Sequence, residues 1–240
     1  MLKNLTRNIF QKLLGFDRYL FVFSIININR IKWGFSEKAY RYFVGMIENE
    51  GAILDIGANI GIMTVVFAKA HHNAMIFSFE PIHSSRKALE RVIRFYRLKN
   101  VTVFANALGD TTGMVEMVMP FAGKAKMQGL SHIVEAGRSE PGEHFSIPIR
   151  KLDDIPGLQT VPRISAIKID VENFEFFVLK GGRTLLERHR PIVFCELWNN
   201  DRRDLCFELM GELGYRVKVF QRGRLIDFTG QPVLDFFFLP

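Results

Sequence analysis

The chain has 240 residues, of which 48% are hydrophobic, and it carries a net charge of +7. This length and apolar fraction predict one large domain with a sizeable core, and they exclude an intrinsically disordered chain. The basic residues are scattered along the chain, which favours a solvated basic surface over a dedicated nucleic-acid-binding face.

Residues 1–50 are expected to form a basic, amphipathic helical extension. Apolar residues recur there at helical spacing, at Leu2, Leu5, Ile9 and Leu13. The pattern favours a helix packed on its own domain, and the alternative is a helix that lies on a membrane surface. The apolar run 19–26 is too short for a membrane span, which needs roughly 20 residues, and no small-residue cleavage site follows it.

The cysteines give a further expectation, about the cellular compartment. Cys195 and Cys206 lie too far apart in the sequence for a CxxC pair, so both are expected to be small buried hydrophobes. A reducing cytoplasm suits such free thiols. Contact with the inner face of the membrane is the added alternative if the N-terminal helix binds lipid.

From residue 51 to residue 240 the sequence predicts a single α/β domain. Strands are expected over 52–56, 74–79, 101–105, 164–169 and 191–197, and helices over 60–70, 83–98, 174–188 and 203–213. Such alternation is typical of right-handed βαβ units and of a mostly parallel sheet with helices on both faces. Two adjacent apolar runs near the C-terminus, 215–220 and 234–239, predict an antiparallel closing edge.

The middle of this domain departs from the alternation. Strands are expected over 115–119 and 145–149, but the segment 120–144 between them is rich in glycine, polar and charged residues. A connection of that length is uncommon in a compact domain and is often functional. We therefore interpret 120–144 as an inserted loop that acts as a lid or a binding loop and selects the substrate.

A glycine-rich turn follows the first predicted strand and indicates a nucleotide cofactor. Gly57 allows the backbone to turn tightly and to approach a ligand, and Gly61 allows the next helix to pack closely on the strand. Glu80 ends the following strand, where a carboxylate can accept hydrogen bonds from both hydroxyls of a ribose. The turn lies at the carboxyl edge of the sheet, where open α/β folds bind ligands.

Two cofactors fit such a turn, namely NAD and S-adenosylmethionine (SAM). A dinucleotide site normally has the pattern GxGxxG, but Asn59 stands at the second glycine and adds bulk where the pyrophosphate would lie. Asp55 places a negative charge nearby, which repels a diphosphate and attracts a sulfonium or an α-amino group. We therefore expect SAM, with an NAD-dependent oxidoreductase as the alternative.

A second acidic cluster follows the strand predicted over 164–169. Asp170 and Glu172 come after this strand and Glu196 ends the next one, so all are expected at the cofactor edge. Methyl transfer to a hydroxyl needs an aligned nucleophile and a group that removes its proton, and these carboxylates are the catalytic candidates. Alternatively, Asp170 holds the SAM amino group, Glu172 caps a helix and Glu196 orients a loop. The histidines lack metal-ligand spacing, so no metal site is expected.

Together, several blocks of sequence resemble the FkbM-type methyltransferase family. These blocks are Leu54–Thr64, Phe79–Pro81, Asn106–Asp110 and Lys168–Gly182, with Glu196 after the next strand. The resemblance implies a Rossmann-like class I methyltransferase fold, usually with a mostly parallel seven-stranded sheet whose last strand is antiparallel. It also implies SAM-dependent methylation of a hydroxyl on a sugar, a glycan or a complex natural product.

Carried over by position, the resemblance implies a cofactor site made of Asp55, Gly57, Asn59, Gly61, Glu80, Pro81, Ala107, Leu108 and Asp170. In this assignment the methionine end of SAM lies against the glycine-rich turn. Glu80 holds the ribose, and Ala107 with Leu108 flanks the adenine.

The family's acidic motif is matched by Asp170 and Glu172, except that Asn173 stands where the family usually has glycine. Asparagine tolerates the left-handed backbone conformation better than most residues do. The expected acceptor is a hydroxyl-bearing small molecule or a glycan. A non-catalytic SAM-binding module that associates with a membrane is the alternative from another functional class.

Overall fold

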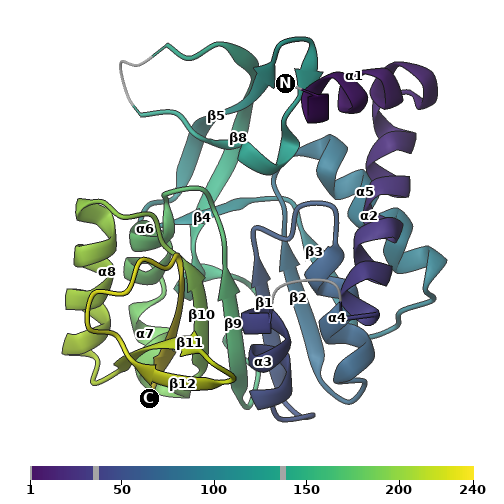
Figure 1. The fold of residues 1–240 in the computed structure, drawn as a ribbon. Coiled ribbons are helices and arrows are strands. Elements are labelled where there is room, and N and C mark those ends of the chain that lie inside the picture. The colour runs from purple at the N-terminus through teal and green to yellow at the C-terminus, as the bar shows by residue number, and fades with distance from the viewer. Residues whose placement is uncertain (1, 35–37, 136–138) are drawn as a thin grey trace.

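The structure is a computed structural model that describes residues 2–34, 38–135 and 139–240. Parts of the predicted N-terminal extension and of the predicted insertion therefore lie outside the described residues, as do the side chains of residues 2–5. Three N-terminal helices precede a central sheet with helices on both faces, and a second, smaller sheet stands at one end of it (Figure 1).

The central sheet has the order β12-β11-β13-β10-β9-β1-β2-β3. Its strands are β1 (Ala52–Ile56), β2 (Met75–Phe79), β3 (Val101–Phe104), β9 (Ile164–Ile169), β10 (Ile192–Glu196), β11 (Arg216–Gln221), β12 (Arg224–Asp227) and β13 (Asp235–Leu239). The helices that connect them are α4 (Ile62–Ala70), α5 (His83–Phe95), α6 (Glu175–Lys180), α7 (Arg183–His189) and α8 (Asp201–Glu212). The five strands from β3 to β10 are parallel, and β13 runs antiparallel to both of its neighbours.

The α/β class, the parallel core and the antiparallel strand β13 agree with the sequence-based prediction, but the strand count does not. The sheet has eight strands and not seven, because β12 adds to its edge by pairing with β11. Arg222 and Gly223, with φ of 50° and 85°, join the two strands. Two adjacent residues in the left-handed region make a tight turn that folds a strand straight back on itself.

Both faces of β1 are covered, which explains why its residues are all buried. Leu54 packs on one face among residues of α6, α7 and α8, while Ile53 packs on the other face with Phe43 and Phe67. Successive side chains of a strand point to opposite faces, so a strand buried on both sides is apolar nearly throughout. The charged exception in β1 is Asp55, whose side chain has no solvent exposure.

One helix predicted over 174–188 is two helices, α6 and α7, interrupted at Gly181 and Gly182. Strand β4 (Ala107–Gly109) packs against this point, where only glycine fits, because a Cβ atom on Gly181 would lie 1.9 Å from the carbonyl oxygen of Gly109. Helix α8 begins earlier than predicted because the side chain of Asn200 caps it.

The second sheet contains β4, β5 (Gly113–Ala122), β6 (Ala125–Lys126), β7 (His132–Ile133) and β8 (Gly142–Lys151). The segment 120–144 is therefore not a plain loop. It contains the end of β5, both short strands, the 3₁₀ turn η1 (Gln128–Leu130) and the start of β8. Strands β5 and β8 pair as far as Pro120 and Gly142, because backbone hydrogen bonds extend a hairpin regardless of side-chain polarity.

Helix α2 (Phe16–Lys32) packs on the domain. It lies along α4 and α5, and Leu20 and Ile28 are buried there. The buried hydroxyl of Ser24 donates a hydrogen bond to the carbonyl oxygen of Ile60, 2.8 Å away, just before α4. This anchoring brings the N-terminal helices to the carboxyl edge of the central sheet.

Helix α1 (Leu2–Leu14) packs on the domain, as the favoured prediction has it, through contacts with α2 and β6. The described part of its apolar stripe does not make this contact, since the exposed fractions of Ile9 and Leu13 are 47% and 75%. Instead Gln11 is buried against β6, where its amide exchanges two hydrogen bonds with the backbone of Lys126, each 3.0 Å long. No described helix is both long enough and apolar enough to span a membrane. Contact of α1 with a membrane surface stays a prediction.

Replacing Leu20 with alanine is expected to destabilise the fold by about 2–5 kcal/mol, because the side chain is fully buried between α2 and the domain. Chemical denaturation measures the loss. Val22→Ala on the outer face of the same helix is the control, and it should change the free energy of unfolding by less than about 0.5 kcal/mol. Equal effects would show that α2 does not dock as described.

Candidate active site

The turn after β1 is shaped by the neighbouring strand. Gly57 has φ of 75°, and a Cβ atom there would lie 1.9 Å from the carbonyl oxygen of Asp170, at the end of β9. Glycine is therefore required there by the left-handed backbone conformation of the turn and by the close approach of another backbone segment. Gly57 also lines the cleft described below, so its expected contact with a ligand stays a prediction. The amides of Gly57 and Ala58 donate hydrogen bonds to the carbonyl oxygen of Phe79, which ties the turn to β2.

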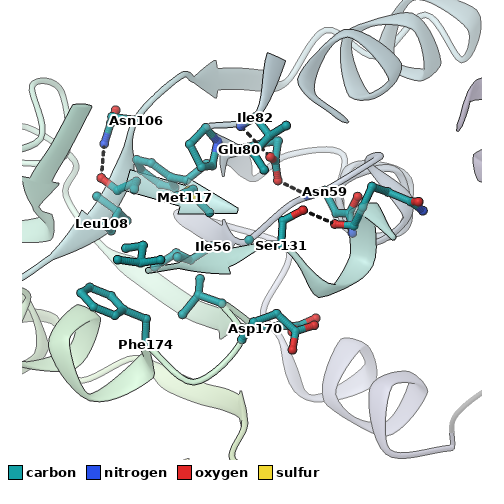
Figure 2. Close-up of a pocket in the computed structure, with 18 of the residues that line it drawn as sticks. Ile56, Asn59, Glu80, Ile82, Asn106, Leu108, Met117, Ser131, Asp170 and Phe174 are labelled. Carbon is teal, nitrogen blue, oxygen red and sulfur yellow. Dashed lines mark hydrogen bonds between the residues drawn. The ribbon is translucent and has the colours of Figure 1, made fainter. Parts of the chain in front are cut away.

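Glu80 stands at the end of β2, where its carboxylate is 6% exposed. Its Oε2 atom accepts a hydrogen bond from the amide of Asn59 and its Oε1 atom accepts one from the amide of Ile82, both 2.8 Å long (Figure 2). Burial raises the pKa of Glu80 to about 7, although both hydrogen bonds oppose the shift. Glu80 is thus a well-positioned acceptor that changes charge near neutral pH.

A cleft opens beside Glu80 at the carboxyl edge of the sheet, and Figure 2 shows side chains from several elements around it. Its polar end is formed by Asn59, Glu80 and Asp170. Its apolar end lies between Leu108 and Phe174. The combination suits a ligand that has a flat apolar ring, adjacent hydroxyl groups and a polar tail.

Most of the predicted cofactor residues lie together on this cleft. The lining includes Gly57, Asn59, Glu80, Pro81, Ala107, Leu108 and Asp170. Asp55 and Gly61 are not among the lining residues. Gly61 lies at the start of α4, and a Cβ atom there would meet Leu89 and Val92 of α5, so it permits packing between two helices and not between helix and strand.

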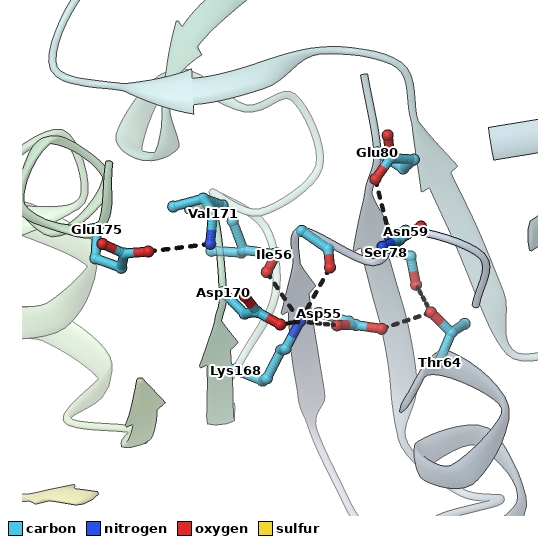
Figure 3. A network of polar contacts seen from close by, with 11 residues as sticks. Asp55, Ile56, Asn59, Thr64, Ser78, Glu80, Lys168, Asp170, Val171 and Glu175 are labelled. Atoms are coloured by element: carbon cyan, nitrogen blue, oxygen red, sulfur yellow. Dashed lines mark hydrogen bonds and ion pairs between the residues drawn. The ribbon is translucent and has the colours of Figure 1, made fainter. Parts of the chain in front are cut away.

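Asp55 is buried below the turn in a network of charges (Figure 3). Lys168 of β9 places its Nζ atom 3.6 Å from Asp55 Oδ1 and 3.4 Å from Asp170 Oδ2. The same ammonium donates a hydrogen bond to the carbonyl oxygen of Gly57, 3.0 Å away. Thr64 completes the network by donating to Asp55 Oδ2 over 2.6 Å. Asp55 therefore helps to hold the turn indirectly, because it binds the ammonium of Lys168 that in turn binds the carbonyl oxygen of Gly57.

Lys168 has no role in the sequence-based prediction, although one signal was available. It is the charged residue within the mostly apolar central strand ISAIKI, and such a residue is almost never buried without a partner. Burial by itself lowers the pKa of Lys168, but the adjacent carboxylates of Asp170 and Asp55 outweigh it and the pKa is raised. The ammonium is therefore charged at neutral pH and lies between both carboxylates.

Among the candidate catalytic carboxylates, Asp170 and Glu172 line the cleft, whereas Glu196 at the end of β10 does not. Burial raises the pKa of Glu172 to about 8, and the negative charges of Asp170, Glu196 and Glu175 add to the shift. Glu196 therefore acts on the cleft through its negative charge, which helps to raise the pKa of Glu172. A carboxyl group with such a pKa is suited to proton transfer near neutral pH.

The capping role that the alternative assigned to Glu172 is not observed, because no described side chain caps α6, whose N-cap residue is Phe174. Glu175, the first residue of the helix, instead binds the loop that precedes it. Its Oε1 atom accepts hydrogen bonds from the amides of Val171 and Asn173, each 3.1 Å long, just before α6. Glu172 and Asn173 have φ of 53° and 71°. The left-handed conformation explains why a glycine is usual at position 173, and asparagine maintains it here.

A second cavity of about 380 Å³ adjoins the cleft. The two spaces share Gly57, Asn59, Gln128, Gly129 and Asp170 as lining residues. The far wall of the second cavity comes from the N-terminal helices, including α3 (Lys38–Met46). The site thus consists of a cleft and an adjacent chamber, with Asp170 between them.

Two sequence-based expectations about metals and thiols can be compared with the described residues. Cys195 and Cys206 are free and buried, as expected. Within residues 2–34, 38–135 and 139–240, no group of histidine, cysteine and acidic side chains is arranged to hold a metal ion.

Replacing Lys168 with methionine is expected to lower the free energy of unfolding by about 3–5 kcal/mol, because Asp55 is then left as an unpaired buried charge. Adding Asp55→Asn to that variant should restore part of the loss. Lys180→Met is the control, since it breaks an exposed pair with Asp110 that is worth about 1 kcal/mol at most. Equal losses in both single variants would contradict a structural role for the buried pair.

The chain is similar to several known proteins. The family model described as the methyltransferase FkbM domain matches residues 55–217. The chain is 28% identical to the 2-O-methyltransferase NoeI of Sinorhizobium fredii over 65% of this chain and 68% of that one. It is 25% identical to the AMB antimetabolite synthetase AmbE of Pseudomonas aeruginosa over 75% of this chain, which corresponds to 10% of AmbE.

Among solved structures, the methyltransferase FkbM from Methylobacillus flagellatus aligns with a TM-score of 0.57 and 18% identity, over 98% of this chain and 59% of that chain. The chain therefore spans only part of the length of some of these relatives. The likeness of fold supports the Rossmann-like class I methyltransferase architecture that the strand order describes. Because the family model covers the glycine-rich turn, Glu80, the acidic motif and β10 together, this chain belongs to the FkbM methyltransferase family.

Proposed function

We propose that this protein is a SAM-dependent O-methyltransferase that transfers a methyl group to a hydroxyl of a sugar, a glycan or a related natural product. Membership of the family supports the methyl transfer. The relative NoeI, named a 2-O-methyltransferase, supports oxygen as the acceptor atom. The choice of SAM as cofactor rests on the buried carboxylate of Glu80. Two backbone amides hold this carboxylate beside the apolar end of the cleft, between Leu108 and Phe174.

The residues of the cleft fit SAM in three respects. Leu108 and Phe174 present apolar surface to an adenine ring, and Glu80 can accept hydrogen bonds from both ribose hydroxyls. The buried Oδ1 atom of Asn59 has no hydrogen-bond partner among the described residues, so it can accept one from the amino group at the methionine end. The carboxylate of Asp170 favours the same positive end.

The NAD alternative fits less well. The pyrophosphate of a dinucleotide would have to lie beside Asp170 and Glu172, and their negative charges would repel it. Asn59 also occupies the position at which a dinucleotide site has its second glycine. Electrostatics and the shape of the turn therefore both favour the sulfonium cofactor.

In the proposed reaction, SAM supplies an electrophilic methyl group, and the protein must align an acceptor hydroxyl with it and remove the proton. Glu172 is the proposed general base, because it lines the cleft and its raised pKa of about 8 suits acceptance of a proton. Asp170, held by Lys168, orients the reacting groups. Glu196 is a positioning residue whose charge maintains the pKa of Glu172.

Binding of S-adenosylhomocysteine is expected to strengthen by up to about tenfold between pH 6 and pH 8, because Glu80 must lose its proton to accept both ribose hydroxyls. Glu80→Gln should weaken binding and flatten this pH dependence, while the exposed Glu208→Gln should change neither. Isothermal titration calorimetry with SAM, S-adenosylhomocysteine and NAD measures all three affinities. Tight binding of NAD without binding of SAM would refute the proposed cofactor.

Glu172→Gln is expected to lower kcat by about 10²–10⁴-fold while S-adenosylhomocysteine binds within about twofold of the wild-type affinity. Glu196→Gln removes a repulsive charge, so it should lower the pKa of Glu172 and move the rise of the pH–rate profile to lower pH. The assay follows labelled methyl groups from SAM into a panel of sugars and glycans. Unchanged kcat in Glu172→Gln would exclude it as the base, and no transfer to any hydroxyl despite tight SAM binding would favour a non-catalytic binding module.

A further inference from the structure

We propose that the chamber beside the cofactor cleft is the acceptor site and that it selects an acceptor carrying an anionic group next to its hydroxyl-bearing ring. The proposal rests on the function proposed above, and it adds the substrate class and the residues that recognise it. The N-terminal helices, which lie outside residues 55–217 matched by the family model, supply the selecting wall.

The position of the chamber suits an acceptor. It shares Asn59, Gln128 and Asp170 with the cleft, so a molecule in the chamber and a cofactor in the cleft can meet beside Asp170. Its volume of about 380 Å³ lies within the range of small-molecule sites, roughly 300–1,000 Å³. A monosaccharide with one substituent fits a space of this size.

Gln128 indicates that a ligand belongs there. Its side chain is only 6% exposed, and its Oε1 atom is buried without a hydrogen-bond partner among the described residues. Leaving a buried amide oxygen unpaired costs about 1–3 kcal/mol. A hydroxyl group of an acceptor on this shared wall would supply the missing donor.

Arg7 supplies the preference for an anion. Arg7 lines the chamber, where one nitrogen of its guanidinium donates to the thioether sulfur of Met127, 2.7 Å away and a weak acceptor. No carboxylate of residues 2–34, 38–135 or 139–240 forms an ion pair with it. The other cation on the lining, Lys168, is neutralised by two carboxylates. Arg7 is therefore available for bidentate contact with a carboxylate or a phosphate.

The remaining lining suits the body of a ring. Phe23 of α2 and Tyr40 of α3 contribute aromatic surface, and Ile31 adds an aliphatic contact. Sites that are mainly apolar with a few directed polar groups orient small molecules well. An anionic group at Arg7 and a hydroxyl near Asp170 would fix the two ends of such a ring.

The proposal is tested with the full chain saturated with S-adenosylhomocysteine and with three matched probes, which are glucose, glucuronate and glucose 6-phosphate. We expect the two anionic sugars to bind about tenfold more tightly than glucose, which corresponds to one charge-assisted contact of about 1.4 kcal/mol. In Arg7→Met this preference should vanish. Arg18→Met, which removes an exposed charge from the neighbouring helix α2, is the matched control and should retain it.

Gln128→Leu provides a second measurement. It should weaken binding of all three sugars while the melting temperature stays the same or rises, because an unpaired buried oxygen is removed. Inorganic phosphate, measured alone, distinguishes recognition of the anion from recognition of the whole sugar. Phosphate that binds as tightly as glucose 6-phosphate would refute a sugar-shaped site.

Other outcomes would overturn the proposal as well. Equal binding of the three sugars by the wild type, or an unchanged preference in Arg7→Met, would show that Arg7 does not select the acceptor. Weaker binding of S-adenosylhomocysteine in Arg7→Met would place Arg7 at the methionine carboxylate of the cofactor. Failure of the wild type to bind S-adenosylhomocysteine would instead refute the proposed function, so the two failures are distinguishable.

Discussion

The rest of the site depends on one buried cation, the ammonium of Lys168, held between Asp55 and Asp170. Lys168 lies on β9, Asp55 on β1, and the carbonyl oxygen of Gly57, which accepts a hydrogen bond from the ammonium, lies in the turn between β1 and α4. One side chain thus connects the ends of two neighbouring strands and the turn that faces the ligand. Displacing it would release the turn and Asp170 together.

The main effect of this buried network is to position the turn and the Asp170 carboxylate, and its net contribution to the stability of the fold is small. Removing charges from water costs several kcal/mol per ion, and their mutual attraction roughly offsets this cost. The result is a turn whose backbone and carboxylate are positioned before any ligand arrives, which is the condition for efficient alignment of reacting groups. Raised pKa values at Glu80, Glu172 and Glu175 follow from the same burial at the same sheet edge.

Elements that are distant in the sequence complete the site. Helix α1 contacts β6 of the second sheet through Gln11, and α2 lies along α4 and α5 (Figure 1). Both helices thereby bring residues to the chamber beside Asp170. The segment 120–144 contributes Gln128 from a 3₁₀ turn whose position is set by the β5–β8 hairpin. The cleft is therefore formed by the α/β core together with the second sheet, whereas the chamber also depends on the N-terminal helices.

By itself, the sequence determined the parallel α/β core, the glycine-rich turn at Gly57 and the positions of Glu80 and Asp170 at one edge, because strand periodicity and chain order place the ends of parallel strands together. Only the tertiary structure decided that Asp55 lies below the turn, that Glu172 does not cap α6, that β12 extends the sheet, and that Arg7 and Gln128 line the chamber. The burial of Asp55 and the positions of Arg7 and Gln128 depend on contacts between segments far apart in the chain, and local sequence patterns do not encode such contacts.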